Sequence, residues 1–176
     1  MSDLVNQPFT HSAIHSFSHS PIKMINPRAQ MLIDALASGP KDVARMLRPL
    51  NADNMRFVPM AGEWCIAQVV AHLIDIEPKF RARLQRIVEQ DNPHEPFIVP
   101  DENAYDASIP IEVLLAEFAE RRVATTSYLA SLKNTDWIRI CTHDTFGVTK
   151  LHQQVRILIG HDNEHLAQII AIREKL

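Results

Sequence analysis

Two histidines near the end of the chain are spaced to bind one metal ion. His161 and His165 begin and end the pentapeptide HDNEH. Residues four apart stack on one face of a helix with Cβ atoms about 6 Å apart, so both imidazoles can reach the same ion. In a heptad pattern both fall on the seam that carries Leu151, Leu158 and Ile172, where core side chains are expected. Because a buried imidazole is costly unless it is satisfied, this pair is a candidate for metal binding.

His72 shows the same anomaly in another segment. It lies between Val69 and Ile76 on a stripe whose helical spacing should face the core. Three histidines on the inner faces of two helices can form a three-nitrogen site with open coordination positions. A divalent ion in such a site activates water or binds a thiol as its thiolate. The alternative is that each is a hydrogen-bonded core residue, and spacing alone supports His161 with His165 more strongly than it supports His72.

The pentapeptide also matches the H-x-x-E-H pattern of the inverted zincin proteases. Those enzymes take a third ligand from a carboxylate well downstream, whereas this chain ends at Leu176, eleven residues after His165. Glu164 lies about 100° around a helix from His165, so it is not clearly on the metal-binding face. We therefore do not favour a protease.

Four helices are expected to position the histidines. Only 4 glycines occur, and apolar residues recur mainly at spacings of three and four, which predicts an all-α fold with strands rare or absent. The sequence predicts a four-helix bundle whose helices cover about 26–50, 65–89, 110–132 and 149–173. Two long connections are expected, at 91–110 and 135–148. An irregular N-terminal segment over residues 1–25 precedes a single bundle domain over residues 26–176.

Prolines and capping residues give the details of these helices. Asn26 is a good N-cap for the first helix. Pro40 lies inside its pattern and predicts a kink or two shorter helices, of which we favour the kink. Pro78 predicts a bend in the second helix. We expect Val123 of the third helix to face the core and Thr149 to cap the fourth.

Composition excludes several classes of protein. The chain has 18 Lys+Arg against 21 Asp+Glu with no basic cluster, so nucleic-acid binding is not expected. No apolar run reaches the roughly 20 residues of a membrane span, and the N-terminus lacks the features of a secretory signal. Cys65 and Cys141 are far apart and form no C-x-x-C pair, which favours a reducing compartment. We therefore expect a soluble, cytoplasmic protein that binds no membrane.

Five motifs follow one another in an order typical of one family. They are GEWCI and VAHLIDIE around His72, DENAY before the third helix, FGVT before the fourth, and GHDNEHLAQI around His161 and His165. In order and spacing they resemble the DinB/YfiT-like superfamily over residues 27–172. The resemblance implies a four-helix bundle, often a homodimer, that binds a divalent ion, commonly zinc or nickel, through these three histidines. It also implies relatives that use low-molecular-weight thiols such as bacillithiol or mycothiol. The chain departs from the family at Cys65, where a Ser more usually caps the helix.

Two further residues are weaker candidates for the chemistry. Asp75 follows His72 by three residues and can orient an imidazole or accept a proton, but it can equally be a solvated helix residue. Tyr105 follows the acidic pair Asp101-Glu102 and is a candidate to position substrate at the rim of a pocket.

Other charged residues are expected to be solvated. His11, His15 and His19 are also four apart, but they stand in a Ser-rich segment without apolar periodicity, which argues against a second metal site. Arg121 and Arg122 are expected to form surface ion pairs on the third helix.

Two functions remain open from the sequence. The first is a metal-dependent enzyme, a thiol-dependent S-transferase or a hydrolase, acting on a small electrophilic molecule. The second is a non-catalytic, dimeric, stress-related protein that binds a metal. They differ in whether the ion keeps an exchangeable position facing an open pocket.

Overall fold

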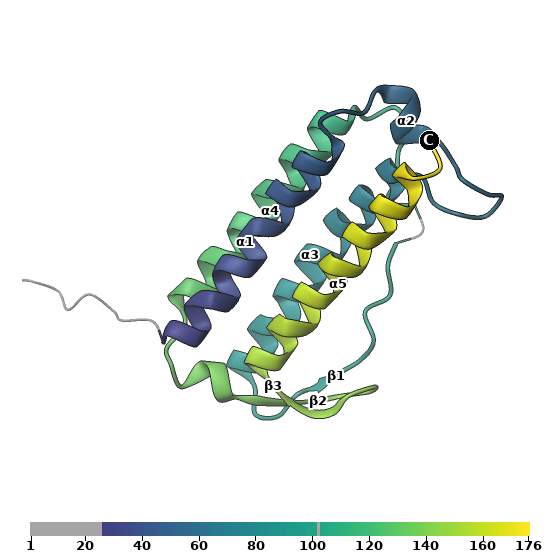
Figure 1. The fold of residues 1–176 in the computed structure, drawn as a ribbon. Coiled ribbons are helices and arrows are strands. Elements are labelled where there is room, and N and C mark those ends of the chain that lie inside the picture. Colours follow the sequence, from purple (N-terminus) through teal and green to yellow (C-terminus); the bar gives the residue numbers. More distant parts are fainter. Residues whose placement is uncertain (1–25, 102) are drawn as a thin grey trace, which may run out of the picture.

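Four long helices form the bundle that the sequence predicts (Figure 1). The computed structural model describes residues 26–101 and 103–176. The long helices are α1 (Pro27–Leu47), α3 (Ile66–Glu89), α4 (Ile111–Ser131) and α5 (Leu151–Arg173). Helices α1 and α5 run in one direction and α3 and α4 in the other, and α1 and α3 each pack against both α4 and α5. None of the helices in the described ranges has the length and apolar character needed to cross a membrane.

Short elements close the two ends of the bundle. They are α2 (Ala52–Arg56), the 3-10 helix η1 (Asp136–Ile138), β1 (His94–Glu95), β2 (Ile140–His143) and β3 (Gly147–Lys150). The strands form a sheet in the order β1-β2-β3, with β1 parallel to β2 and β2 antiparallel to β3. From the end of the bundle that holds the sheet, the connection after β1 runs back along the bundle to the start of α4. Helices α3 and α4 are therefore parallel (Figure 1). Strands are rare, as expected, but the second connection is a 3-10 turn and a hairpin rather than irregular chain.

Thr149 does not cap the last helix, so that prediction is wrong. The residue lies in β3 and pairs with Cys141 of β2. Lys150 occupies the N-cap position, and its backbone N–H donates to Oε1 of Gln153 at 2.8 Å. Strand β3 continues through Lys150, so the helix begins at Leu151 and its N-cap lies one residue later than predicted.

A polar layer divides the core into two apolar clusters at one level of the bundle. The cluster nearer the sheet includes Leu36, Phe80 and Leu158, and the other includes Val43, Phe118 and Ile169. Between them lie the polar residues Glu77, Arg122, His161, Asp162 and His165. All the long helices but α1 therefore place polar side chains at the level where the site is built.

Arg122 is buried in this layer, which corrects the expectation of a surface ion pair. Only 2% of the residue is exposed. Its Nε and Nη2 donate to the two carboxylate oxygens of Glu77 at 2.9 and 2.8 Å, and Nη1 and Nη2 donate to Asp162 at 2.5 and 3.0 Å. Because Arg122 turns inward, Val123, about 100° further around the helix, faces solvent and is 62% exposed, contrary to the prediction. Arg121 does form the expected ion pair, with Glu117.

The two helical prolines stay inside continuous helices. Pro40 lies within α1, so the alternative of two shorter helices is wrong. A proline has no N–H to donate to the carbonyl four residues earlier. For Pro78 of α3 that carbonyl belongs to Ile74, and it accepts instead from Nη1 of Arg121 at 2.9 Å. The carbonyl of Leu36, which Pro40 leaves without a helical donor, accepts from Arg122 at 2.9 Å.

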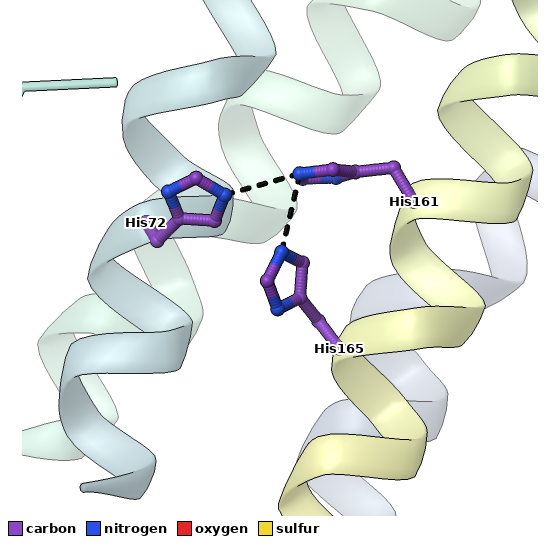
Figure 2. Close-up of side chains that lie close together, drawn as sticks. All are labelled: His72, His161 and His165. Carbon is purple, nitrogen blue, oxygen red and sulfur yellow. Dashed lines mark hydrogen bonds between the residues drawn. The ribbon is translucent and has the colours of Figure 1, made fainter. Parts of the chain in front are cut away.

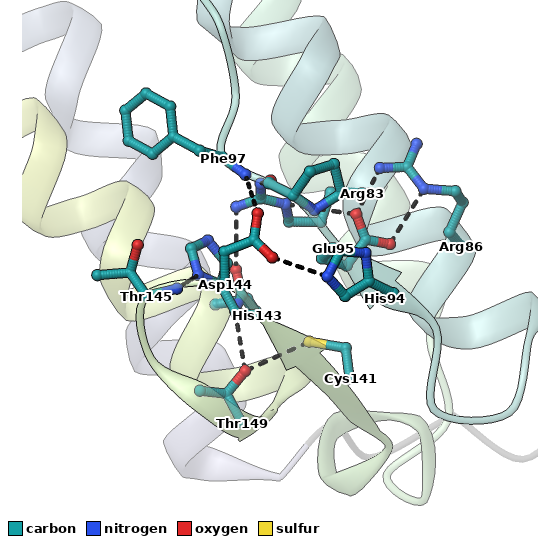
Figure 3. Close-up of polar contacts among 12 residues, drawn as sticks. Arg83, Arg86, His94, Glu95, Phe97, Cys141, His143, Asp144, Thr145 and Thr149 are labelled. Carbon is teal, nitrogen blue, oxygen red and sulfur yellow. Dashed lines mark hydrogen bonds and ion pairs between the residues drawn. The ribbon is translucent and has the colours of Figure 1, made fainter.

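Polar contacts fasten the sheet to α3 (Figure 3). Glu95 of β1 is fully buried and accepts from Nε and Nη2 of Arg86 at 3.0 and 2.5 Å. Nε of Arg83 lies 3.5 Å from the same carboxylate. His143 is buried in β2, where its Nδ1 accepts from the N–H of Thr145 at 3.0 Å. These contacts hold the three-stranded sheet against the end of α3.

The N-terminal predictions lie outside the described residues. They concern the irregular segment over residues 1–25 and the histidines His11, His15 and His19. The division into this segment and a bundle domain stays a prediction.

Candidate metal centre

Three histidine side chains meet between α3 and α5 (Figure 2). His72 comes from α3, and His161 and His165 come from successive turns of α5. The Nε2 atom of His161 lies 3.0 Å from Nε2 of His72 and 3.2 Å from Nε2 of His165. One nitrogen from each residue lies within 4.8 Å of the other two. The fold therefore brings together the three histidines that the sequence singled out.

The donor set fits a divalent ion. Nitrogens that share one zinc ion at about 2.0–2.1 Å lie about 3.0–3.4 Å from one another, and both Nε2 contacts fall in that range. Buried histidines usually form hydrogen bonds with backbone groups or with side chains of other types. Here Nε2 of His161 instead faces the Nε2 atoms of two other histidines. Its Nδ1 is buried and has no hydrogen-bond partner among the described residues. A shared ion gives all three lone pairs the same partner.

Gln168 fixes the orientation of one imidazole. Its Oε1 lies 2.9 Å from Nδ1 of His165. An amide oxygen only accepts, so Nδ1 of His165 carries the proton and Nε2 presents its lone pair to the centre. Gln168 stands one turn after His165 on the same side of α5. From the sequence alone, Gln168 was assigned no role.

Burial keeps two of the imidazoles neutral. It lowers the pKa of His72 from 6.5 to about 4, with a further lowering by the charge of His165. The pKa of His161 falls to about 3, first through burial and then through the charges of His165 and His72. Both are therefore unprotonated near pH 7. The neutral imidazole is the form that binds metals.

Trp64 lines two cavities beside the histidines. Its ring centroid lies 5.1 Å from that of His72 and 6.3 Å from that of His165. The cavity next to His72 has a volume of about 370 Å³ and is also lined by Gln68, Ala71, Pro100, Asp101, Ala104 and Tyr105. A second cavity, of about 480 Å³, is lined by His165 together with Gly62, Glu63, Gln168, Ala171, Ile172 and Lys175. His72 and His165 are thus accessible from outside the bundle.

Comparison with known protein families shows which family the chain belongs to. The family model described as the DinB superfamily matches residues 35–169. The chain belongs to the DinB superfamily. A similar protein from Bacillus mycoides, named "Putative metal-dependent hydrolase", is 25% identical over 139 residues, which is 78% of this chain and 80% of the relative. A protein of the same name from Oceanobacillus iheyensis is 28% identical over 141 residues, which cover 75% of this chain and 80% of that protein.

Solved structures with the DinB fold superpose on most of the chain. YfiT from Bacillus subtilis, described as a probable metal-dependent hydrolase with an unusual four-helix bundle topology, matches with a TM-score of 0.71 at 19% identity. The match covers 89% of this chain and 92% of YfiT. A DinB-like protein from Bacillus cereus matches with a TM-score of 0.61 at 15% identity over 82% of this chain and 90% of its own. At these identities the likeness shows the fold.

Asp75 of this DinB bundle holds a loop and makes no hydrogen bond to His72. Its Oδ2 accepts from Nζ of Lys79 at 2.7 Å and from the backbone N–H of Asp101 at 2.9 Å. Burial raises the pKa of Asp75, but the hydrogen bonds from Lys79 and from the Asp101 backbone outweigh it and hold the pKa below its usual range. This carboxylate therefore anchors the connection that carries Tyr105.

Tyr105 does line the cavity beside His72. Burial raises the pKa of its phenol, and the neighbouring Cys65 raises it further. The phenol therefore keeps its proton at neutral pH and can donate it in a hydrogen bond. Cys65 itself is buried at the N-terminus of α3, and its backbone N–H donates to Oε1 of Gln68 at 2.9 Å.

Trp64, like Gln168, is a site residue that sequence reasoning missed. The only signal was its place in the GEWCI motif, one residue before the N-cap of α3. That motif suggested family membership but not that the indole would lie against two of the three imidazoles.

Proposed function

We propose that this protein is a metal-dependent hydrolase of a small, uncharged electrophile such as an ester or amide. His72, His161 and His165 hold a divalent ion, zinc or nickel. The observation that carries the proposal is the convergence of three Nε2 atoms beside an accessible cavity. The names of the similar proteins from Bacillus mycoides and Oceanobacillus iheyensis support the same reaction class.

The residues around the ion prepare it for hydrolysis. Neutral imidazoles offer their lone pairs, and Gln168 holds the ring of His165 in one orientation. Three protein nitrogens leave coordination positions open, and the bound ion supplies Lewis-acid activation of water and of a substrate carbonyl.

The cavity beside His72 is suited to a compact substrate. A volume of about 370 Å³ lies at the lower end of small-molecule sites. Trp64, Ala71 and Pro100 provide apolar walls, and the phenol of Tyr105 can donate to a substrate oxygen. In hydrolysis a water oxygen bonds to the carbonyl carbon, the carbon–oxygen or carbon–nitrogen bond to the leaving group breaks, and that group departs with a proton.

Isotope labelling tests the reaction. Protein purified without a histidine tag is loaded with zinc or cobalt and incubated with small esters, lactones and amides in ¹⁸O-labelled water, with and without an added thiol. We expect acid product carrying one ¹⁸O atom from the wild type and from Asn163→Ala, an exposed substitution inside the same pentapeptide. His161→Ala is expected to lose the turnover.

Two outcomes contradict the proposal. A thioester product that forms only with thiol, releases the alcohol or amine and carries no label would make the protein a thiol-dependent transferase. No turnover by fully metal-loaded protein across the panel would leave the non-catalytic, metal-binding function instead.

A further inference from the structure

A third cavity lies at the end of the bundle where α1 and α5 begin. It has a volume of about 470 Å³. Its walls come from the first turns of α1 and α5 and from the link between α4 and β2; they are Asn26, Arg28, Ala29, Met31, Leu32, Asn134, Trp137, Ile138, His152 and Arg156. His152 and His161 are nine residues apart in α5, which places the cavity about 14 Å along the helix axis from the metal centre. It is therefore separate from the candidate metal site.

The ionisable residues of this cavity are all basic. Arg28, His152 and Arg156 line it, and none of its lining residues is acidic. Neither arginine forms an ion pair with any residue in the described part of the chain. Burial lowers the pKa of His152, and the nearby charges of Arg156 and Lys150 lower it further, as a positive local potential requires. A guanidinium group that pairs with no protein carboxylate can donate two hydrogen bonds to the oxygens of a bound anion.

The rest of the wall is apolar and partly uncovered. Met31 is 70% exposed and Ile138 is 60% exposed. Leu32 and the buried indole of Trp137 continue this surface. A pocket with an apolar wall and a few convergent charged groups is typical of a small-molecule site.

We infer that this cavity binds a small amphipathic organic acid. Its carboxylate pairs with Arg28 and Arg156, and its hydrocarbon part lies on Leu32, Ile138 and Trp137. The inference concerns a site apart from the metal centre and does not depend on the proposed hydrolase.

Octanoate is a suitable probe, because it joins one carboxylate to an eight-carbon chain. Its affinity for the full chain is measured by calorimetry and compared with those of acetate, which lacks the chain, and octanol, which lacks the charge. We expect octanoate to bind at least about tenfold more tightly than either. The methyl resonances of Leu32 and Ile138 should shift on binding, and in a Trp64→Phe background the remaining tryptophan, Trp137, should report it by fluorescence.

Arginine variants identify the anion-binding groups. Replacing Arg28 and Arg156 together by Gln should weaken octanoate binding about tenfold or more, because charge-assisted hydrogen bonds are lost. Both side chains are exposed, so the fold should tolerate the change. Arg48→Gln, at the far end of α1 and also exposed, is the matched control and should bind as the wild type does.

Three results would overturn the inference. They are equal affinity of the double arginine variant and the Arg48→Gln control, equal affinity for octanol and octanoate, and methyl shifts that avoid Leu32 and Ile138. His161→Ala is expected to keep the wild-type affinity for octanoate, which separates this site from the metal centre.

Discussion

The Nη1 atom of Arg121 lies 2.9 Å from the carbonyl oxygen of Ile74, the carbonyl that Pro78 leaves without its helical donor. The next residue, Arg122, does the same for Leu36, whose helical donor is removed by Pro40. Two consecutive arginines of α4 thus donate hydrogen bonds to backbone carbonyls of α3 and α1 that a proline leaves without a helical donor. These contacts lie at the level of the polar layer that contains the histidines.

A double-mutant cycle tests the link between Arg121 and Pro78. Arg121→Met should lower the free energy of unfolding by about 1–2 kcal/mol, because the carbonyl of Ile74 loses its donor. In a Pro78→Ala background the N–H of Ala can serve that carbonyl, so the same substitution should cost less, with a coupling of about 1 kcal/mol. Urea unfolding measures both. Equal losses in the two backgrounds would show that the arginine does not compensate the proline.

Arg122 should be far more sensitive to substitution. Arg122→Met leaves the carboxylates of Glu77 and Asp162 buried without their shared cation, and removing one partner of a buried ion pair costs about 3–5 kcal/mol. The matched substitution Arg48→Met, at an exposed position, should change the free energy of unfolding by less than about 0.5 kcal/mol. A comparable small effect at both positions would contradict the structural role of Arg122.

Two helical glycines should respond in opposite directions to alanine. A Cβ at Gly39 would lie 3.0 Å from Oδ2 of Asp162 and 3.4 Å from Nη1 of Arg122, and hydrogen bonds hold both groups in place. Gly39→Ala should therefore destabilise the protein by about 1–3 kcal/mol, although alanine favours a helix by about 1 kcal/mol. A Cβ at Gly160 meets nothing within 4 Å, so Gly160→Ala should stabilise by up to about 1 kcal/mol. Thermal unfolding of the two variants gives the signs directly, and stabilisation by Gly39→Ala would contradict the close packing at α1.

Alkaline pH should destabilise the fold through its 2 tyrosines. Burial raises the pKa of Tyr128 to about 12 and also raises the pKa of Tyr105. An unfolded tyrosine ionises near pH 10, so the unfolded state loses its protons first. The tyrosines' contribution is complete below about pH 10 and is lost as the pH rises towards 12. Phenolate absorbance of the native protein should stay low at pH 10 and rise on addition of urea, whereas ordinary titration of both phenols in the native protein would contradict their burial.

Helical spacing predicted much of the histidine cluster that forms the candidate metal centre. The i, i+4 pair His161 and His165 needed only a helix, and His72 needed only a second helix with the same inward stripe. Whether the two stripes face one another depends on which helices are neighbours, and periodicity does not contain that information. The family resemblance pointed to His72 as the third histidine, and the structure places its Nε2 3.0 Å from Nε2 of His161.

Tertiary pairing explains what the sequence did not reveal. A glutamate on a helix normally indicates a solvated face, so the burial of Glu77 follows only from Arg122, 45 residues away. The hairpin over 140–150 was missed because its strands have only 4 residues each. The homodimer, the thiol and the cytoplasmic location expected from the sequence stay predictions.

Metal content tests the central claim most directly. Protein purified without a histidine tag is analysed for metals by elemental analysis and by native mass spectrometry. The wild type and His94→Ala, which removes an exposed histidine outside the site, should each contain about one equivalent of divalent ion. The His161→Ala, His165→Ala double variant should contain almost none. An unchanged metal content in that double variant, or a metal-free wild type that binds no added zinc or nickel, would contradict a metal centre at His72, His161 and His165.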